Sequence, residues 1–164
     1  MKKTLRTFFR PARYAAGMEI RPILPEDESL YRELLVSLNE RDRYLRFFHT
    51  VPNIGASEVL PFVRPRPDMV GLIAVEGGRA VGAAHAFIDD GKAEFAVEVR
   101  PDCRHHGIGS KLLAEIAMRL REQGVRELVA HSLFDNAEFA LIASEANMAP
   151  KQEGAGVNLW RLPL

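Results

Sequence analysis

The sequence predicts a mixed α/β fold: a central, mostly antiparallel sheet with one parallel pair of strands and helices on both faces. Two observations lead to this prediction. The chain has 164 residues, 47% of them hydrophobic, which suits one compact globular domain. Segments with the two-residue period of strands are interspersed with segments that have the period of helices. A sheet covered by helices is the natural packing for such an order.

The first half of the chain is predicted to form one strand and two helices. Residues 18–23 alternate apolar and polar side chains, as a half-buried strand does. Pro25 and the acidic residues after it mark a helix start, because acids favour the positive end of the helix dipole, and leucines then recur at helical spacing to Leu38. A shorter apolar helix is expected around residues 44–48. The prolines and glycine of residues 52–68 predict an irregular loop around one helical turn.

The second half is predicted to form an antiparallel meander, then helices and strands in turn. Glycine-containing turns separate three strand-like segments, at 70–75, 80–88 and 92–99. A long amphipathic helix, a buried strand, another helix and a short strand follow, at 107–123, 126–132, 135–146 and 157–162. Gly124 and Asn147 suit left-handed residues that end these helices, and Asp135 suits an N-cap. The long helix joins two strands, which should therefore be parallel.

Composition excludes several classes of protein. Lys and Arg together number 22 and so do Asp and Glu, which argues against a dedicated nucleic-acid binder. A single cysteine, Cys103, cannot form an internal disulfide or a zinc framework, and no metal site is predicted. No apolar stretch approaches the roughly 18 residues that a membrane span needs. The expectation is a cytoplasmic protein that does not bind membranes.

The chain is expected to divide into a basic N-terminal extension, residues 1–17, and one domain, residues 18–164. The extension contains five basic residues and no acidic residue. It lacks the apolar core of a secretory signal, and its two threonines are few for a transit peptide. We interpret it as an extension or a substrate-docking arm, which Phe8, Phe9 and Tyr14 would hold against the domain.

The segment between the strand at 92–99 and the long helix carries the main functional signal. It reads Arg104-His105-His106-Gly107-Ile108-Gly109-Ser110. Glycines allow a ligand to approach the backbone closely, and the free amides at a helix start attract anions. A strand, a glycine turn and a helix therefore favour a pyrophosphate site. The spacing is neither a full GxGxxG fingerprint nor a P-loop, so a plain strand-to-helix turn is the alternative.

This segment resembles the phosphate loop of the GNAT superfamily of acyl-CoA-dependent N-acyltransferases, which reads Arg/Gln-x-x-Gly-x-Gly/Ala. The predicted order of elements is similar to the GNAT fold over nearly the whole chain after residue 17. Further segments resemble the acetyltransferase domain of bacterial Pat-type protein lysine acetyltransferases. They are Ile20-Arg21-Pro22-Ile23 with Pro25-Glu26-Asp27, Arg43-Tyr44-Leu45-Arg46-Phe47-Phe48, and Ala93-Glu94-Phe95-Ala96-Val97.

The resemblance implies acetyl-CoA as the cofactor. Backbone groups near Val97 and Val99 would pair with the pantetheine amides, and amides of the loop would hold the pyrophosphate. The implied cofactor-binding residues of the loop are Arg104, His105, His106, Gly107, Gly109 and Ser110. Asn136 matches an asparagine that contacts the cofactor arm, and a hydrogen bond at the helix start is its alternative role.

The reaction that the resemblance implies needs a general base. A lysine-like amine, with a reference pKa near 10.4, is protonated at neutral pH and must lose a proton before it attacks. Glu94 occupies the position where the Pat-type enzymes carry a glutamate base. Glu94 and Glu98 share a face of an ideal strand, which makes Glu98 a second candidate, although a bulge typical of the family would break that parity. The plain alternative is that both are solvated strand residues.

One position departs from the family pattern. Many members place a tyrosine in the last helix to protonate the leaving thiolate, and Ala143 stands at that position here. The other candidate groups, Cys103, His85 and His131, are interpreted as packed or hydrogen-bonded residues rather than as nucleophiles or proton shuttles.

The sequence therefore predicts an acetyl-CoA-dependent N-acetyltransferase whose acceptor is a primary amine, with a protein lysine as one candidate. A small-molecule amine acetyltransferase and a non-catalytic acyl-CoA-binding module are the alternatives. Arg64 and Arg66 lie in the loop expected to border the acceptor, which favours an anionic or acidic neighbourhood around that amine. No oligomeric state is predicted.

Overall fold

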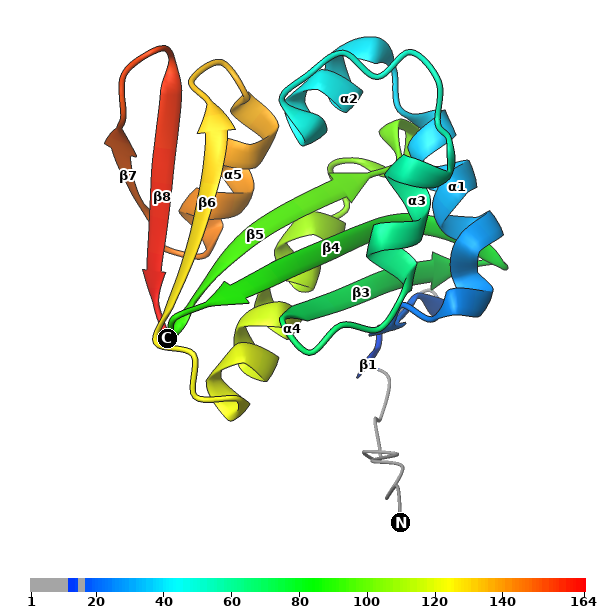
Figure 1. Ribbon diagram of the computed structural model, residues 1–164, viewed down its shortest axis with the longest axis horizontal. Coiled ribbons are helices and arrows are strands. Elements are labelled where there is room, and N and C mark those ends of the chain that lie inside the picture. Colours follow the sequence, from blue (N-terminus) through cyan, green and yellow to red (C-terminus); the bar gives the residue numbers. More distant parts are fainter. Residues whose placement is uncertain (1–11, 15–16) are drawn as a thin grey trace.

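An eight-stranded sheet forms the centre of the computed structural model, which describes residues 12–14 and 17–164 (Figure 1). The order across the sheet is β1-β2-β3-β4-β5-β6-β8-β7. The strands are β1 (Ala12–Arg13), β2 (Glu19–Pro22), β3 (Met69–Glu76), β4 (Arg79–Asp89), β5 (Lys92–Val99), β6 (Glu127–Leu133), β7 (Ala149–Gln152) and β8 (Val157–Pro163). All neighbours are antiparallel except β5 and β6, so the predicted mixed sheet and its parallel pair are confirmed.

The parallel pair separates soon after it forms. Three positions of β5, Lys92 to Glu94, pair with Glu127 to Val129 of β6 within the described chain. Beyond them the two strands diverge, and Figure 1 shows the opening widening away from the C-terminus. The helix α5 (Ala137–Glu145) lies beside this opening, and the helix α2 (Glu40–Phe47) lies across from it.

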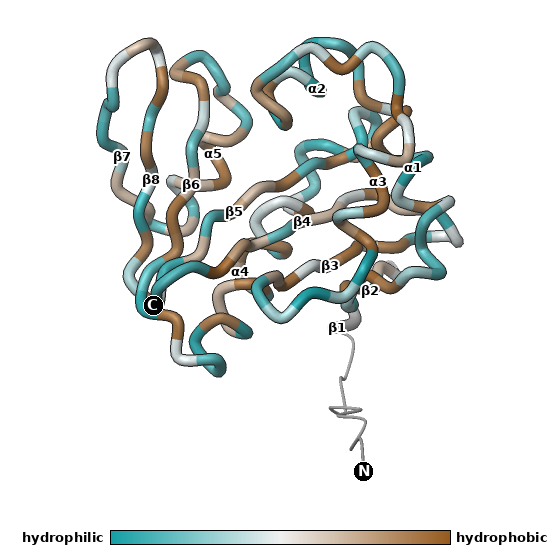
Figure 2. The backbone as a smooth tube through the Cα atoms, viewed as in Figure 1, coloured by the Kyte–Doolittle hydropathy of each residue, from teal (hydrophilic) through white to brown (hydrophobic). Residues whose placement is uncertain are grey.

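Helices cover both faces of the sheet, and the sheet separates two hydrophobic cores. On one face α4 (Ile108–Glu122) and α5 pack in a core that contains Leu72, Leu112 and Trp160. On the other, α1 (Glu28–Ser37) and α3 (Ala56–Val63) pack in a core that contains Tyr31, Leu34 and Ile73. Leu72 and Ile73 are neighbours on β3 that point to opposite faces, as alternation along a strand requires. Figure 2 shows hydrophobic and hydrophilic segments alternating along the helices, as expected where one side is buried.

Most of the predicted extension, including Phe8 and Phe9, lies outside the described residues. Its described part contacts the domain. Ala12 pairs with Ile20 across β1 and β2, and the Tyr14 hydroxyl donates a hydrogen bond to Glu115 Oε1 at 3.0 Å on α4.

The largest difference from the predicted elements is in residues 52–68. The prolines predicted an irregular loop around one turn, but α3 is an eight-residue helix. Pro61 lies inside it, and the buried side chains of Val59 and Val63 hold the helix against the core. In so short a helix, the missing amide of one proline removes a single backbone hydrogen bond, and packing outweighs that loss.

Two smaller predictions are also wrong. The strand β7 was not predicted because its four residues are all exposed, so no apolar alternation marks it. Asn136, not Asp135, is the N-cap of α5, and its side-chain oxygen accepts a hydrogen bond from the Phe139 amide at 3.1 Å. The left-handed residues Gly124 and Asn147 are confirmed, with φ of 76° and 57°.

The family-typical bulge that would break the parity of Glu94 and Glu98 is absent from the pairing of β5 with β4, which runs without a shift from Gly82–Val99 to Asp89–Lys92. A register shift occurs instead between β3 and β4, at Ala74 and Val75. Because β5 is regular, Glu94 and Glu98 stand on the same face of the sheet.

Candidate active site

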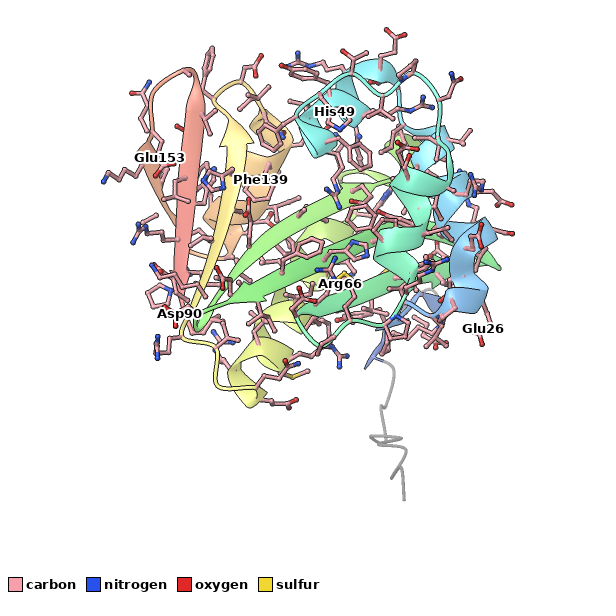
Figure 3. The ribbon with its side chains drawn as sticks, viewed as in Figure 1. Glu26, His49, Arg66, Asp90, Phe139 and Glu153 are labelled. Carbon is pink, nitrogen blue, oxygen red and sulfur yellow. The ribbon has the colours of Figure 1, made fainter. Side chains whose placement is uncertain are left out.

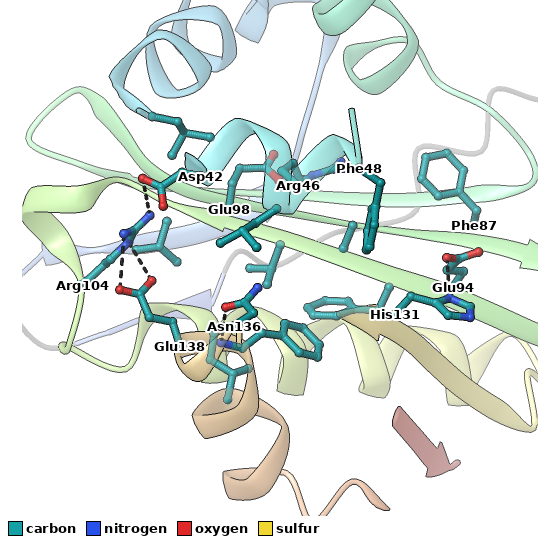
Figure 4. A pocket seen from close by; sticks show the side chains of 18 residues that line it. Asp42, Arg46, Phe48, Phe87, Glu94, Glu98, Arg104, His131, Asn136 and Glu138 are labelled. Carbon is teal, nitrogen blue, oxygen red and sulfur yellow. Dashed lines mark hydrogen bonds and ion pairs between the residues drawn. The ribbon is translucent and has the colours of Figure 1, made fainter. Parts of the chain in front are cut away.

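The opening between β5 and β6 holds a groove made of two adjoining cavities. One, of about 280 Å³, is lined by residues of α2, β5, β6 and α5 (Figure 4). The other, of about 200 Å³, lies against the loop before α4. Four residues line both cavities: Val99, Arg104, Glu138 and Ile142. The groove therefore runs from the start of α4 along β5 to Glu94 and His131.

The backbone of β5 faces this groove with unpaired hydrogen-bonding groups. The Arg100 amide donates to the Val81 carbonyl at 2.9 Å, toward β4. Because backbone groups alternate in direction along a strand, the amides and carbonyls of Val97 and Val99 point away from β4. On that side the described pairing with β6 ends at Glu94. Val97 and Val99 can therefore pair with an extended ligand that lies in the opening.

The loop before α4 also presents free amides. Gly107 is its N-cap, in the left-handed conformation at φ 74°, and the Gly107 carbonyl accepts the first helical bond, from the Lys111 amide at 3.0 Å. The amides of Ile108, Gly109 and Ser110 precede that bond and have no partner within the helix. Such a row of donors at the positive end of a 15-residue helix suits a phosphate group.

Gly107 and Gly109 serve different purposes. Gly107 has open space around it, so its positive φ is what favours glycine there. A Cβ on Gly109 would collide with the side chain of Ile142, so Gly109 allows α4 to pack closely on α5. The structure adds this packing against Ile142 to the ligand role that the sequence suggested for Gly109, which also lines the smaller cavity.

The side chain of Arg104 joins the two sides of the groove. Its guanidinium forms ion pairs with Asp42 of α2 and Glu138 of α5, both at 3.1 Å (Figure 4). Ser110 Oγ donates to Glu145, also on α5. The ring of His106 contacts the Cys103 carbonyl through Nδ1 at 3.1 Å, and His105 is exposed with a φ of 64°. The loop can thus contact a phosphate mainly through its backbone.

The two candidate bases lie in different environments. The Glu94 side chain is 59% exposed at the far end of the groove, and its Oε1 lies 3.0 Å from His131 Nδ1. The Glu98 side chain is only 1% exposed, and Arg46 Nε of α2 donates to its Oε2 at 2.6 Å. Both side chains line the larger cavity, but Glu98 is buried and ion-paired, whereas Glu94 is exposed to an incoming molecule.

Glu98 and Arg46 belong to a buried polar cluster with Tyr31 and His85. Burial raises the pKa of the Tyr31 hydroxyl well above its ordinary value, and the negative charge of Glu98 adds to that rise. Burial lowers the pKa of His85 to about 4; the Glu98 charge opposes this change, and the Arg46 charge adds to it. His85 Nε2 lies 3.1 Å from the Phe62 carbonyl, so His85 is a neutral core residue at neutral pH. The packed role predicted for His85 agrees with these contacts.

Other predicted residues have structural contacts as well. Cys103 is a buried free thiol, and burial raises its pKa. Ala143 is fully buried in the core beside Phe139, which Figure 3 shows on α5 near the diverging strands. Asn136 lines the groove while it caps α5.

No cluster of three or more His, Cys, Asp or Glu side chains that could hold a metal occurs in residues 12–14 and 17–164. No helix in that part of the chain is long and apolar enough to cross a membrane.

The described features fit an acyl-CoA donor. Unpaired strand amides suit its pantetheine arm, and the amides at the start of α4 suit its diphosphate. A split parallel pair with a glycine loop at the next helix defines the class of acyltransferases that bind their donor between two strands.

Comparison with known proteins agrees with this class. The model of the acetyltransferase (GNAT) family matches residues 29–139. The GNAT domain of S. lividans PAT is 26% identical, with a TM-score of 0.86, over 96% of this chain and 97% of that one. PaiA N-acetyltransferase from Thermoplasma acidophilum, solved in complex with coenzyme A, is 15% identical, with a TM-score of 0.69, over 90% of this chain and 99% of that one.

A cAMP-binding acyltransferase from Mycobacterium smegmatis is also similar in fold. It is 22% identical, with a TM-score of 0.63, over 94% of this chain and 47% of that one. The family model spans more than half of the sequence, so the chain belongs to the GNAT acetyltransferase family. It is an N-acetyltransferase that uses acetyl-CoA.

Proposed function

We propose that this enzyme acetylates a lysine side chain of a protein and that Glu94 is the general base. The observation that carries the proposal is the position of Glu94 in the groove. Its carboxylate stands on β5 three residues before Val97, where the free strand edge begins, and it is exposed at the end of the groove remote from the loop. An amine that enters from solvent at this end meets Glu94 before it reaches the donor.

The proposed roles of the cofactor-binding residues follow the course of the groove. Amides of residues 104–110 hold the diphosphate, and the backbone of Val97 and Val99 pairs with the pantetheine arm. Asn136 contacts the same arm from the start of α5. The bound donor supplies an activated thioester. These residues thus fix the thioester carbonyl near Glu94, and orientation of this kind lowers the barrier to reaction.

Glu94 then makes the amine reactive. The ammonium transfers a proton to the Glu94 carboxylate, directly or through one water, and the neutral amine attacks the thioester carbonyl. The C–N bond forms, the nitrogen gives its second proton to water, the C–S bond breaks, and coenzyme A leaves as the thiolate. Because Ala143 is buried and cannot donate a proton, the thiolate takes its proton from water or from the protonated Glu94.

The end of the groove suits a cationic, surface-exposed acceptor. Glu94 lines this end together with the rings of Phe48 and Phe87, and the exposed carboxylate of Glu153 contacts His131 next to it. A lysine ammonium is attracted by carboxylates and by aromatic faces. The likeness to the GNAT domain of S. lividans PAT also favours a protein acceptor.

The test uses acetyl-CoA with separate panels of lysine-containing proteins and of small amines, and follows coenzyme A release and product mass. We expect acetyl-lysine on protein, and Glu94→Gln should lower kcat roughly 10²–10⁴-fold with an unchanged Kd for acetyl-CoA. Glu122→Gln, on the exposed side of α4, is the matched control. Full activity of Glu94→Gln would remove Glu94 from the mechanism, and preference for a small amine would overturn the protein acceptor.

A further inference from the structure

The imidazole of His131 lies between two carboxylates at the end of the groove. Its Nδ1 is 3.0 Å from Glu94 Oε1, and its Nε2 is 3.4 Å from Glu153 Oε2. The three side chains come from β6, from β5 and from the connection between β7 and β8. Figure 4 shows His131 against Glu94, and Figure 3 shows Glu153 on the hairpin of β7 and β8.

The chemistry of the three groups determines which bonds they can form. An ionised carboxylate only accepts hydrogen bonds, so each contact needs a proton on the ring nitrogen that faces it. A proton on Nδ1 bonds the ring to Glu94, and a proton on Nε2 bonds it to Glu153, so both bonds form together only on the doubly protonated, cationic ring. The contact with Glu94 engages Oε1 and leaves Oε2 free.

Glu94 needs the contact with His131 because little else around its side chain restricts the orientation of the carboxylate. Its side chain is 59% exposed and has three rotatable bonds. A base must lie within hydrogen-bond distance of the proton that it removes, and ordering a free glutamate costs side-chain entropy.

We propose that His131 is a positioning residue for Glu94, and that Glu153 in turn orients the His131 ring. His131 Nδ1–H holds Oε1 of Glu94, so that Oε2 points toward the incoming amine. This inference rests on the proposed role of Glu94 as the base. It assigns to His131 a function in the reaction, where the sequence suggested a packed or hydrogen-bonded residue, and to Glu153 a function that the sequence did not suggest.

A purely structural role for His131 makes different predictions. His131 and Glu94 lie where β5 and β6 begin to diverge, so their contact also joins two strands. If that were its whole purpose, replacing His131 would lower stability and leave kcat unchanged in the folded fraction. A separation of kcat from KM and Kd therefore distinguishes the two roles.

The kinetic test uses acetyl-CoA with poly-L-lysine as the acceptor. We expect His131→Ala to lower kcat roughly tenfold, the scale set by freeing one glutamate side chain, with an unchanged Kd for acetyl-CoA. His131→Asn should restore most of the rate, because its amide can donate from nearly the position of Nδ1. Glu153→Gln should cost about twofold to threefold, since the ring keeps its contact with Glu94.

A double substitution separates this inference from the proposed function. In a Glu94→Gln background, His131→Ala should cost no further activity, because the two residues act through one contact. If Glu94→Gln alone leaves kcat intact, the proposed function fails. If Glu94→Gln abolishes activity while His131→Ala leaves kcat unchanged, Glu94 remains the base and the role of His131 is overturned.

A second measurement needs no acceptor. Ring ¹⁵N chemical shifts of His131 in the free protein report which nitrogens carry protons. We expect a proton on Nδ1 at neutral pH, and a change in that signal in Glu94→Gln but not in Glu122→Gln. The proposal would be overturned if the ring were protonated only on Nε2 and its ¹⁵N chemical shifts were the same in Glu94→Gln. This result would hold even if poly-L-lysine were a poor acceptor.

Discussion

The helices α4 and α2 both border the groove, but they are attached to the sheet in opposite ways. The helix α4 buries seven of its 15 residues against the core. The helix α2 has no fully buried apolar side chain, and Phe47 packs only partly against the core. It is tied by ion pairs of Arg46 with Glu98, Asp42 with Arg104, and Arg41 with Asp135.

This difference predicts how ionic strength and pH affect the two helices that border the groove. Apolar burial is non-directional and does not depend on ionic strength or on protonation. Ion pairs depend on both, and exposed pairs most of all. The loop that we propose for the diphosphate is therefore built into the rigid core. The helix α2 depends on charge: salt screens its exposed pair of Arg41 with Asp135 and has much less effect on the buried pair of Arg46 with Glu98.

Removing the Glu98 carboxylate should have the largest effect. Glu98→Ala leaves the Arg46 guanidinium buried without a counter-charge, and we expect the free energy of unfolding to fall by about 3–5 kcal/mol in urea denaturation. The double variant Arg46→Met/Glu98→Leu should be as stable as the parent or more so, because the charge is then absent. A loss under about 1 kcal/mol in Glu98→Ala would show that α2 does not depend on this pair.

In the helix α4, which is held by apolar burial, Leu112→Ala removes a fully buried side chain. We expect a loss of about 2–5 kcal/mol, equal at low and high salt, because a cavity and lost burial cause it. Met118→Ala serves as the control, since Met118 is on the same helix and 45% exposed; its effect should stay within about 0.5 kcal/mol. A salt-dependent loss in Leu112→Ala would contradict the division between apolar and ionic attachment.

Lowering the pH should first reduce the stability of the core that contains α1 and α3, where His85 is buried. Because burial lowers the pKa of His85 from 6.5 to about 4, the unfolded chain binds more protons than the folded one between these values. Stability is fully present above pH 6.5 and falls as the pH drops toward 4, by up to roughly 1.4 kcal/mol per pH unit.

Unfolding measured from pH 7 to 4.5 tests this slope, and hydrogen exchange locates it. His85→Gln keeps a donor for the Phe62 carbonyl but does not titrate, so it should flatten the slope. A slope of equal size in His85→Gln would assign the acid sensitivity to other groups.

The smallest expected effect is at the exposed ion pair between Arg41 and Asp135, whose nitrogen and oxygen lie 2.9 Å apart. Arg41→Ala should cost about 0.2–1 kcal/mol at low salt, and the cost should vanish above about 0.5 M salt because of screening. Arg121→Ala, an exposed position on α4, should show no salt-dependent loss. Persistence of the Arg41 effect at high salt would point to packing rather than charge.

The sequence was informative where local patterns determine structure. The meander, the helix α4 and the parallel pair follow from periodicity and glycine positions, which act over a few residues. The helix α3 was missed because prolines indicate breaks, whereas the burial of Val59 and Val63 is decided by distant residues. The strand β7 was missed because it pairs through its backbone and carries no apolar pattern.

In the candidate site, the sequence placed Glu94, Val97, Val99 and Asn136 along one groove. It did not reveal that Glu98 is buried against Arg46, 52 residues away, or that His131 contacts Glu94 from 37 residues away. Such contacts depend on how α2 and β6 approach β5, which no local pattern records. The collision that Ile142 would make with a side chain at position 109 is hidden for the same reason.

The short junction between β5 and β6 has a consequence for cooperativity. In the sheet, three described pairs join the strands β1 to β5 to the unit formed by β6, β8 and β7, and the core around Trp160 joins them below it. A weak junction lets one part of a protein open while the rest stays folded. A donor arm bonded to Val97 and Val99 would occupy the space between the diverging strands and link them, so we expect donor binding to suppress local opening there.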